Sequence, residues 1–397
     1  MTPLLFVSSI LANYESKLYY SLMFTVNNLR QIRVQKGYTQ QALSDRVGIS
    51  RQAYTAIEAG RSIPSTDVAM KIARALDTTV EDIFSLEDGS EIIIAAQPAT
   101  DLITAERNTA VRLTKVGSRL FARPSLASSA ATHQIIPAEG LIVGTGGSDG
   151  QLLVQLLDEE VTRVPNLVMS GCDPAAGLLA TALSKKGVRL VLLERGSQDA
   201  LKELACGEVH IAGCHLFDEA TGQFNLPWIS KLVPFPCTVV HFAVWREGLM
   251  TAPSNPKSIG GIDDLARPDI SIVNRQKGSG SRMLLDRLLS QHGILPSQVR
   301  GYGREVNGHL TAAEVIAAGF ADVGVGIEVA AKAFGLGFIP LGEGQYDLVI
   351  PDHFIDQLSI NVLLDTLRKG SIRRHFSTLG NYDTTSMGLP GVRTKAD

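Results

Sequence analysis

The sequence predicts a multidomain protein, with an all-α domain of five helices at residues 25–86, a small β-rich connector at 87–165 and an α/β region at 166–380. Short helical patterns separated by glycines fill the first segment. Apolar and β-branched residues alternate between Gly, Pro and Ser clusters in the second, and apolar strands alternate with helical runs in the third. The length of 397 residues suits two or three such domains.

The composition is that of packed globular material, with 45% hydrophobic and 19% charged residues. A formal net charge of −3 excludes a general polycation. The segment from Asn27 to Leu86 nevertheless carries eight Lys and Arg against six Asp and Glu. Any affinity for nucleic acid must therefore come from a local patch in this first domain.

The cysteines form no C-x-x-C pair and are spread over Cys172, Cys206, Cys214 and Cys237. This spacing argues against a zinc site and a disulfide framework, and predicts core or pocket cysteines in a reducing compartment. No stretch approaches the roughly 20 apolar residues of a membrane span. We therefore expect a cytoplasmic protein with no metal, no cofactor and no membrane partner.

The residues before Met23 lack the basic start of a targeting segment, and Asn13, Glu15 and Lys17 interrupt their apolar run. A helical pattern begins within a few residues of Met23. We therefore expect translation to start at Met23 rather than at Met1.

The first domain carries start and stop signals for its helices. Gly37 suits the end of the first helix, and Thr39 suits the cap of the second. Gly48 makes the turn to a third helix, which Ser50 caps and Gly60 ends. The residues expected to face the core include Leu29, Ile32, Ala42, Leu43, Val47, Ala53 and Ile57, whereas Tyr54 is open to packing or to DNA contact.

The stretch "LRQIRVQKGYTQQALSDRVGISRQAYTAIEAGRSIPSTDVAMKIARAL" resembles the Xre/Cro-type helix-turn-helix repressor family over nearly the whole domain. The resemblance implies a homodimer on operator DNA, with a recognition helix that starts at Ser50 and lies in the major groove. Arg51, Gln52 and Thr55 would face base edges, since Gln pairs with adenine and Arg with guanine. Gln40 at a helix N-terminus suits a phosphate. A bundle that binds only protein is the alternative.

The connector is expected to form short strands at "EIIIAAQP", "NTAVRLTKVGSRLFARPS" and "LIVGTGG". Residues 146–150 also fit the G-x-S-x-G pattern of a hydrolase nucleophile. A single five-residue match is a weak signal, so we do not expect catalysis at Ser148.

In the third segment, strand-to-helix junctions at 170–173, 196–199 and 278–282 carry small or polar residues. The carboxyl ends of strands in an open α/β sheet meet along one edge, so we expect these junctions to converge on one cleft. Several helix N-termini that point at one place favour an anion. The "KGSGSR" junction lacks the spacing of a Walker loop or a dinucleotide fingerprint, and a plain capping turn is its alternative.

Most of residues 166–351 resemble the periplasmic-binding-protein-like domain of type II, the molybdate-binding-like kind, in pieces such as "SGCDPAAGLLA", "VHIAGCHLFDEATGQFN", "ISIVNRQKGSGSRMLLDRLL" and "GHLTAAEVIAAGFADVGVGIE". That domain occurs beside helix-turn-helix units in regulators and at the end of some molybdopterin biosynthesis proteins. It implies two lobes that close on a ligand by a hinge, with cross-over segments near "VVHFAVWREG" and "GFIPLGEGQYDLVIP". Residues 352–376 are expected to form a helix on the first lobe, and residues 380–397 a loose end.

The candidate ligand-binding residues are Ser170, Cys172, Asp173, Ser197, Arg275, Gly278, Ser279, Gly280, Ser281, Arg282, His309 and Tyr346. Ser279, Ser281 and free backbone N–H groups would bind an oxyanion, and Arg282 would supply charge. Arg275 either adds to this charge or braces the loop.

The remaining polar residues leave alternatives open. Asp173 would repel a bare multivalent anion unless it caps its helix, which leaves room for a zwitterionic or hydroxylated ligand. His309 either lines the cleft or caps a helix. His210 and His215 are too poorly spaced for a metal pair and are expected to be structural.

These expectations describe a ligand-responsive transcription regulator that is not an enzyme. Its partners would be operator DNA and a small molecule, with molybdate or tungstate as the oxyanion that the resemblance suggests. The alternatives are an enzyme or accessory protein acting on a molybdopterin-like substrate, and a DNA-bound scaffold with a degenerate cleft.

Overall fold

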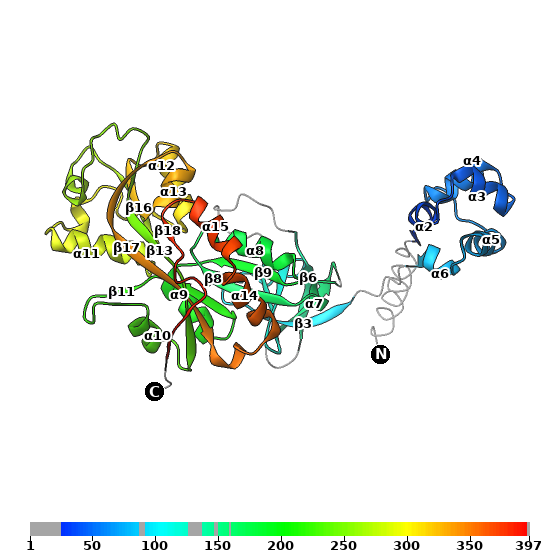
Figure 1. Ribbon diagram of the computed structural model, residues 1–397, viewed down its shortest axis with the longest axis horizontal. Helices are drawn as coiled ribbons and strands as arrows, with labels where there is room; N and C mark the ends of the chain where they lie inside the picture. The colour runs from blue at the N-terminus through cyan, green and yellow to red at the C-terminus, as the bar shows by residue number, and fades with distance from the viewer. Residues whose placement is uncertain (1–24, 87–91, 126–136, 147–149, 159, 395–397) are drawn as a thin grey trace, which may run out of the picture. The chain divides into compact units, whose positions relative to one another are not determined.

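The structure of the protein, a computed structural model, describes residues 25–86, 92–125, 137–146, 150–158 and 160–394 (Figure 1). It divides into two compact units, unit 1 up to Glu91 and unit 2 from Ile92. The expected start at Met23 and the serine Ser148 lie outside the described residues.

Unit 1 contains the expected helices, and its short strands β1 (Thr25–Asn27) and β2 (Phe84–Leu86) pair antiparallel. The helices are α2 (Leu29–Gln35), α3 (Gln40–Val47), α4 (Arg51–Glu58), α5 (Thr66–Leu76) and α6 (Val80–Ile83). Thr39 and Ser50 cap α3 and α4 by accepting hydrogen bonds of 3.1 Å from the N–H groups of Ala42 and Ala53. Gly48 ends α3 with a φ of 77°, a left-handed conformation that makes the tight turn to α4.

The core of unit 1 confirms the buried positions of Leu29, Leu43, Val47 and Ile57. Ala42 and Ala53 are exposed instead, so that part of the expectation is wrong. Tyr54 takes the inward position on α4 and is fully buried. It lies three residues before Ile57, so both side chains share the helix face that packs into the core.

Unit 2 begins with a closed barrel in which the strands follow the order β3-β5-β4-β6-β7. Their bounds are β3 (Ile93–Pro98), β4 (Ala110–Val116), β5 (Arg119–Pro124), β6 (Gly140–Gly146) and β7 (Gln151–Leu156), followed by the helical turn α7 (Glu160–Arg163). Buried apolar side chains such as Leu113, Ile142 and Val154 fill its own small core. The predicted connector is therefore a packed barrel, because β3 pairs with both β5 and β7 and closes the sheet.

The rest of unit 2 is built on a ten-stranded sheet whose main path is β15-β14-β16-β13-β17-β10-β8-β9. The bounds are β8 (Asn166–Gly171), β9 (Arg189–Glu194), β10 (Ile211–Cys214), β13 (Cys237–Thr251), β14 (Ile272–Arg275), β15 (Glu305–Val306), β16 (Val323–Ile327) and β17 (Gly337–Pro351). β8, β9 and β10 run parallel in the first lobe, and β14, β15 and β16 run parallel in the second.

Helices follow these strands in both lobes, which places helix N-termini near the carboxyl ends of the strands. The first lobe has α8 (Ala176–Ser184), α9 (Ser197–Ala205), the strands β11 (Phe217–Asp218) and β12 (Gln223–Phe224), and α10 (Leu226–Leu232). The second has α11 (Gly280–Gln291), α12 (His309–Ala317) and α13 (Glu328–Ala333). Among the described residues, no helix combines the length and apolar character needed to cross a membrane.

The long strands β13 and β17 connect the lobes and confirm the predicted cross-over segments. Residues 247–251 of β13 pair with β16 in the second lobe, whereas residues 347–349 of β17 pair with β10 in the first. The two strands also pair with each other along nearly their whole length. The two-lobed architecture is therefore confirmed.

The C-terminal segment is more ordered than expected. It forms two helices on the first lobe, α14 (Leu358–Leu367) and α15 (Gly370–Thr378), and α14 contacts α8 and β8. The strands β18 (Tyr382–Asp383) and β19 (Pro390–Arg393) then pair with β13. The expectation of a loose end after residue 380 is wrong, because Tyr382 is buried and its hydroxyl donates a hydrogen bond of 2.6 Å to Asp173.

Candidate functional site

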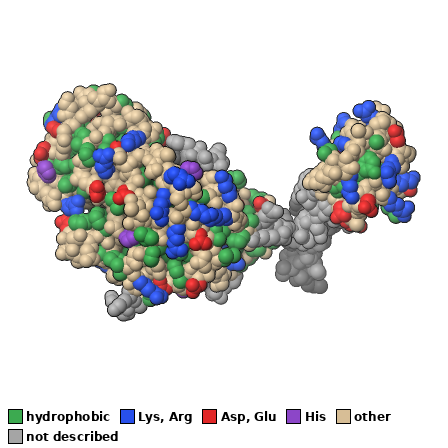
Figure 2. All heavy atoms as spheres, viewed as in Figure 1, with side chains coloured by type: hydrophobic (Ala, Val, Ile, Leu, Met, Phe, Trp, Pro, Cys, Tyr) green, Lys and Arg blue, Asp and Glu red, His purple; other side chains and the backbone are tan. Residues whose placement is uncertain are grey.

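The residues expected to read DNA share one face of α4. Arg51 and Gln52 are exposed, and Thr55 is half-buried with its hydroxyl donating a hydrogen bond of 2.8 Å to the Arg51 carbonyl. The three side chains line one shallow hollow together with Ala56 and Arg61. Ser50 uses its hydroxyl to cap the helix. Figure 2 shows Lys and Arg side chains on the visible face of unit 1, and such side chains are the ones that neutralise DNA phosphates.

Gln40 is tied into an ion-pair network inside unit 1. Its Nε2 donates a hydrogen bond of 3.1 Å to Glu58, whose carboxylate accepts two more from Arg33 at 2.8 and 2.9 Å. The hydrogen bond from Arg33 lowers the pKa of Glu58 despite partial burial. This network joins α3 to α4. It also engages the side-chain amide of Gln40, which was expected to contact a DNA phosphate.

The strand ends of both lobes meet at one buried cluster, which confirms that the predicted junctions converge. Cys172 and Asp173 follow β8, Ser197 starts α9, Arg275 ends β14 and His309 starts α12. All five side chains are at most 7% exposed. Other predicted residues buried in this region are Ser170, Ser279, Gly280, Ser281, Arg282 and Tyr346.

The two lobes contact each other at this cluster. The Gln198 N–H of the first lobe donates a hydrogen bond of 3.1 Å to the Gly278 carbonyl of the second. Gly280 lies so close to His215 that a Cβ there would be 2.1 Å from the His215 carbonyl oxygen. The lobes are thus closed, which is the arrangement that surrounds a ligand on both sides.

Arg275 offers the cluster a buried cation whose terminal nitrogens make no hydrogen bond among the described residues. Its Nε donates a hydrogen bond of 3.1 Å to Gln276, but neither Nη atom has a partner among the described residues. Burial lowers the pKa of Arg275, while Cys172 and Glu194 oppose that effect. Because a buried guanidinium without partners is costly, the geometry favours the charge-supplying role over the bracing role.

Arg282 has a different role from the expected one. Its guanidinium binds Asp286 at 3.0 Å and Glu305 at 3.2 Å, and stacks over the ring of Tyr302. Its charge is therefore neutralised within the second lobe, and Arg275 replaces it as the candidate anion-binding cation.

The two serines of the "KGSGSR" loop also bind within the protein. Ser279 caps α11 by accepting a hydrogen bond of 3.3 Å from the Arg282 N–H. Ser281 donates one of 3.0 Å to Glu247 on β13. The capping alternative therefore describes Ser279 better than ligand binding does, and Gly278 contributes a positive φ of 82° to the turn.

Besides Arg275, four predicted residues present buried polar atoms without a hydrogen-bond partner in the described part of the chain: Ser170 Oγ, Asp173 Oδ2, both ring nitrogens of His309 and the Tyr346 hydroxyl. Asp173 does not cap α8, whose N-cap is Ala175 without a side-chain cap; its Oδ1 accepts a hydrogen bond of 2.8 Å from the Ala175 N–H in the turn before that helix. Burial raises the pKa of Asp173 to about 6, and the bond from Tyr382 opposes it. His309 makes no side-chain cap on α12, and its ring lies beside those of His215 and Trp245 in the buried cluster.

Sequence reasoning missed His215 as a cleft residue. Its Nε2 lies 3.3 Å from Cys172 Sγ, and its Nδ1 lies 3.1 Å from a Glu247 oxygen. Burial lowers the pKa of His215, but Cys172 and Glu247 raise it more, to about 10. His215 directly follows the apolar strand β10, just as Cys172 follows β8, and this placement was the available signal.

His210 is confirmed as structural. Its Nδ1 accepts a hydrogen bond of 3.1 Å from the Val168 N–H, and its ring packs against Phe354. Ser197 likewise serves the fold, since its hydroxyl accepts a hydrogen bond of 3.2 Å from the His215 N–H.

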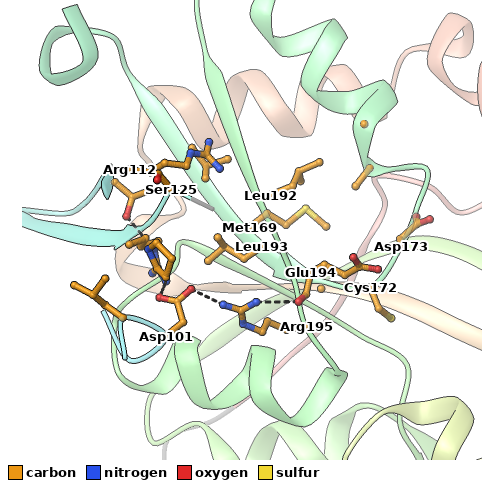
Figure 3. Close-up of a pocket in the computed structure, with 18 of the residues that line it drawn as sticks. Asp101, Arg112, Ser125, Met169, Cys172, Asp173, Leu192, Leu193, Glu194 and Arg195 are labelled. Carbon is orange, nitrogen blue, oxygen red and sulfur yellow. Dashed lines mark hydrogen bonds and ion pairs between the residues drawn. The ribbon is translucent and has the colours of Figure 1, made fainter. Parts of the chain in front are cut away.

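A cavity of about 650 Å³ lies between the barrel and the first lobe and reaches the buried cluster (Figure 3). Met169, Leu192 and Leu193 give it an apolar side. Its lining also includes four residues at or beside the cluster, Cys172, Asp173, Glu194 and Tyr346. The cavity and the cleft therefore form one binding region.

Ion pairs fasten the barrel to the first lobe at the edge of this cavity, as Figure 3 shows for Asp101 and Arg195. Arg195 binds Asp101 at 2.5 Å and Glu203 at 2.8 Å. The buried Arg123 reaches Asp101 at 3.3 Å and donates a hydrogen bond of 2.7 Å to the Glu208 carbonyl. The barrel is thus a wall of the binding region rather than a spacer.

The fold and the two sites define a protein that joins a helix-turn-helix domain to a periplasmic-binding-protein-like domain. Family models agree, with a helix-turn-helix at residues 29–83 and a PBP superfamily domain at residues 180–368. The chain belongs to the same family as the uncharacterized protein YvgK of Bacillus subtilis, to which it is 34% identical over 236 residues, or 59% of this chain and 76% of that protein.

Further similarities concern single domains. The first domain is 48% identical over 65 residues to an HTH-type transcriptional regulator of Methanothermobacter thermautotrophicus, which is 16% of this chain and 94% of the relative. Among solved structures, the sulfate-binding protein SubI of Mycobacterium tuberculosis aligns with 55% of this chain and 86% of its own, at 14% identity and a TM-score of 0.42. The protein is a DNA-binding regulator with a PBP-like ligand-binding domain.

Proposed function

We propose that this protein is a cytoplasmic, ligand-responsive transcriptional regulator that binds a small anionic molecule between the lobes of unit 2. Occupancy of the cleft changes the affinity of unit 1 for operator DNA, which the protein reads as a homodimer. The observation that carries the proposal is Arg275, which is 1% exposed and whose Nη atoms are both unpartnered within the described residues.

The nature of the anion follows from the surroundings of Arg275. Molybdate and tungstate are the oxyanions suggested by the resemblance to molybdate-binding-like domains. The carboxyl groups of Asp173, Glu194 and Glu247 lie near the same cluster and would repel a free divalent oxyanion. The adjoining cavity of about 650 Å³ has the size that drug-sized organic ligands occupy. An organic acid or organic phosphate therefore fits the region better.

Calorimetric titration of the full-length protein tests the ligand. The compounds are molybdate, tungstate, sulfate and phosphate, beside a panel of organic acids and organic phosphates. Arg275→Gln is expected to abolish saturable binding of whichever compound binds. Arg304→Gln removes the same charge from an exposed position of the second lobe and is expected to bind normally. Undiminished binding by Arg275→Gln would contradict an anion site at this residue.

Coupling to DNA is tested separately. An operator duplex is selected from a random library with the full-length protein, and its affinity is measured without ligand and at saturating ligand. The two affinities are expected to differ, because a ligand that prefers one state of the protein shifts its population. Equal affinities would remove the regulatory link and leave the binding site intact.

A further inference from the structure

Three side chains in the cleft form a cluster that anion binding does not explain. Cys172 follows β8, His215 follows β10 and His309 begins α12, so the first lobe provides two of them and the second lobe one. One donor atom of each lies within 4.8 Å of the others, and all three residues are buried. Closure of the lobes is what brings His309 to the other two.

A thiolate with two imidazoles is a ligand set that suits Zn²⁺ and similar transition metals. With Zn–S bonds of about 2.3 Å and Zn–N bonds of about 2.0 Å, tetrahedral geometry separates sulfur and nitrogen by roughly 3.6 Å. Cys172 Sγ and His215 Nε2 are 3.3 Å apart. These two atoms are therefore already spaced nearly as ligands of one ion.

A carboxylate lies beside His215 on the side away from Cys172, where metal-binding histidines commonly have one. Glu247 lies 3.1 Å from Nδ1, which leaves Nε2 directed at Cys172. Ser281 donates a hydrogen bond of 3.0 Å to the same Glu247 oxygen and holds the carboxylate in place. One ring nitrogen of His215 thus lies close to a carboxylate of the second lobe, while the other faces Cys172.

His309 provides an independent observation. It is fully buried, and neither ring nitrogen has a hydrogen-bond partner among the residues that the structure describes. A bond from one nitrogen to a metal ion would satisfy this otherwise costly burial. A thiol–imidazole pair of Cys172 and His215 alone would not explain the burial of His309 without hydrogen-bond partners.

The charges near the cluster are compatible with a dication. Arg275 is the nearby cation, and Glu194 and Glu247 contribute carboxyl groups close to it. A Cys172 thiolate would add another negative charge. A dication would therefore offset negative charge that Arg275 alone does not balance.

We propose that Cys172, His215 and His309 bind a transition-metal dication of the Zn²⁺ class across the closed cleft. Three protein ligands leave a coordination position for water or for a small molecule in the cleft. Because the ligands come from both lobes, the metal would hold the lobes together. This inference depends neither on regulation of transcription nor on the identity of the anion.

Cobalt substitution of the full-length protein tests the site. The protein is stripped with a chelator, dialysed and titrated with Co²⁺, which gives a thiolate-to-metal charge-transfer band when a cysteine binds it. We expect stoichiometric binding with this band, and its displacement by Zn²⁺. Absence of tight Co²⁺ and Zn²⁺ binding would overturn the proposal.

The free cysteines of the chain provide the matched control. Cys172→Ser is expected to lose the band, whereas Cys214→Ser, at a buried free cysteine directly before His215, is expected to retain it. His309→Gln is expected to weaken Co²⁺ binding by about tenfold or more. Circular dichroism and thermal unfolding show whether each variant is folded. A band that survives in Cys172→Ser would contradict the site.

A chemical probe separates the metal site from a reactive thiol. Zn²⁺ is expected to protect Cys172 from alkylation by iodoacetamide, with the modified cysteine identified by mass spectrometry. Rapid alkylation of Cys172 that Zn²⁺ does not slow would instead indicate a free thiolate–imidazolium pair and exclude the metal.

Discussion

At the scale of single residues, burial and immediate partners give one residue type very different properties. His210 and His215 lie five positions apart, and both are buried. Burial alone lowers the pKa of His210 to about 4. His215 is equally enclosed, but Cys172 and Glu247 overcome burial and raise its pKa to about 10. The tertiary neighbours therefore decide which histidine carries a proton.

The first prediction concerns pH and His210. The unfolded chain protonates this histidine near the usual pKa of about 6.5, whereas the folded protein keeps it neutral down to about pH 4. Its contribution to stability is therefore present above pH 6.5 and is lost as the pH falls. Between pH 7 and pH 5 the free energy of unfolding should drop by about 2 kcal/mol through this residue.

Urea unfolding at both pH values checks this prediction. The loss of unfolding free energy between the two pH values is measured for the native sequence and for His210→Asn, and the difference between them is the contribution of His210. In the variant, the Asn side-chain oxygen can accept the hydrogen bond from the Val168 N–H. His375→Asn, at an exposed histidine on α15, serves as the control and should retain the pH dependence. An unchanged pH dependence in His210→Asn would show that other groups cause the loss.

At the scale of elements, α4 has its two faces clearly divided. Tyr54 and Ile57 pack into the core, and Arg51 and Gln52 are exposed. Ser50 fixes the first turn through its cap, and the pairing of Arg33 with Glu58 holds the last. The helix is therefore rigid along the face that would enter the major groove, as base recognition requires.

The second prediction concerns that exposed face. Arg51→Ala is expected to weaken binding to the selected operator by about 1–3 kcal/mol, because a bidentate contact to guanine would be lost. Arg74→Ala removes the same charge from an exposed position on α5 and should bind nearly as well as the native sequence. Fluorescence anisotropy with labelled duplex measures both. Equal losses would mean that charge alone, rather than α4, determines binding.

At the scale of the whole of unit 2, the site exists only because the lobes are closed. β13 and β17 join the lobes, and each strand ends in a different lobe from the one in which it begins. Contact between the lobes occurs through glycines, since Gly280 lies against His215 and Gly308 lies against Glu194. Side chains at these positions would keep the lobes apart.

The third prediction follows from this close approach. An alanine Cβ at position 280 would lie 2.1 Å from the His215 carbonyl oxygen, so Gly280→Ala must open the cleft. Overpacking of this kind costs about 1–3 kcal/mol, and ligand affinity should fall on the order of tenfold or more. Gly303→Ala in the same lobe meets no atom within 4 Å and should bind normally.

Calorimetry of the full-length protein measures ligand affinity, and small-angle X-ray scattering measures how much the protein compacts when ligand is added. Gly280→Ala should show weaker binding and a smaller compaction on addition of ligand. If both glycine variants bind equally well, the lobes close by a different contact.

The sequence by itself determined the organisation of this protein. Unit 1 was predictable from its helix caps, its glycine turns and its resemblance to the Xre/Cro-type family, because these signals depend on residues that are close together in the chain. The alternation of strands and helices placed Cys172, Asp173, Arg275 and His309 at the carboxyl ends of strands or the starts of helices. Parallel topology then made their convergence predictable.

Only the tertiary structure decided what each of these residues does. Arg275 and Arg282 look alike in the sequence, but Asp286 and Glu305 neutralise Arg282, whereas both Nη atoms of Arg275 are left without partners in the described structure. Barrel closure and the bond from Tyr382 to Asp173 likewise join segments far apart in the chain. Charge compensation and burial depend on such distant neighbours, and local patterns carry no record of them.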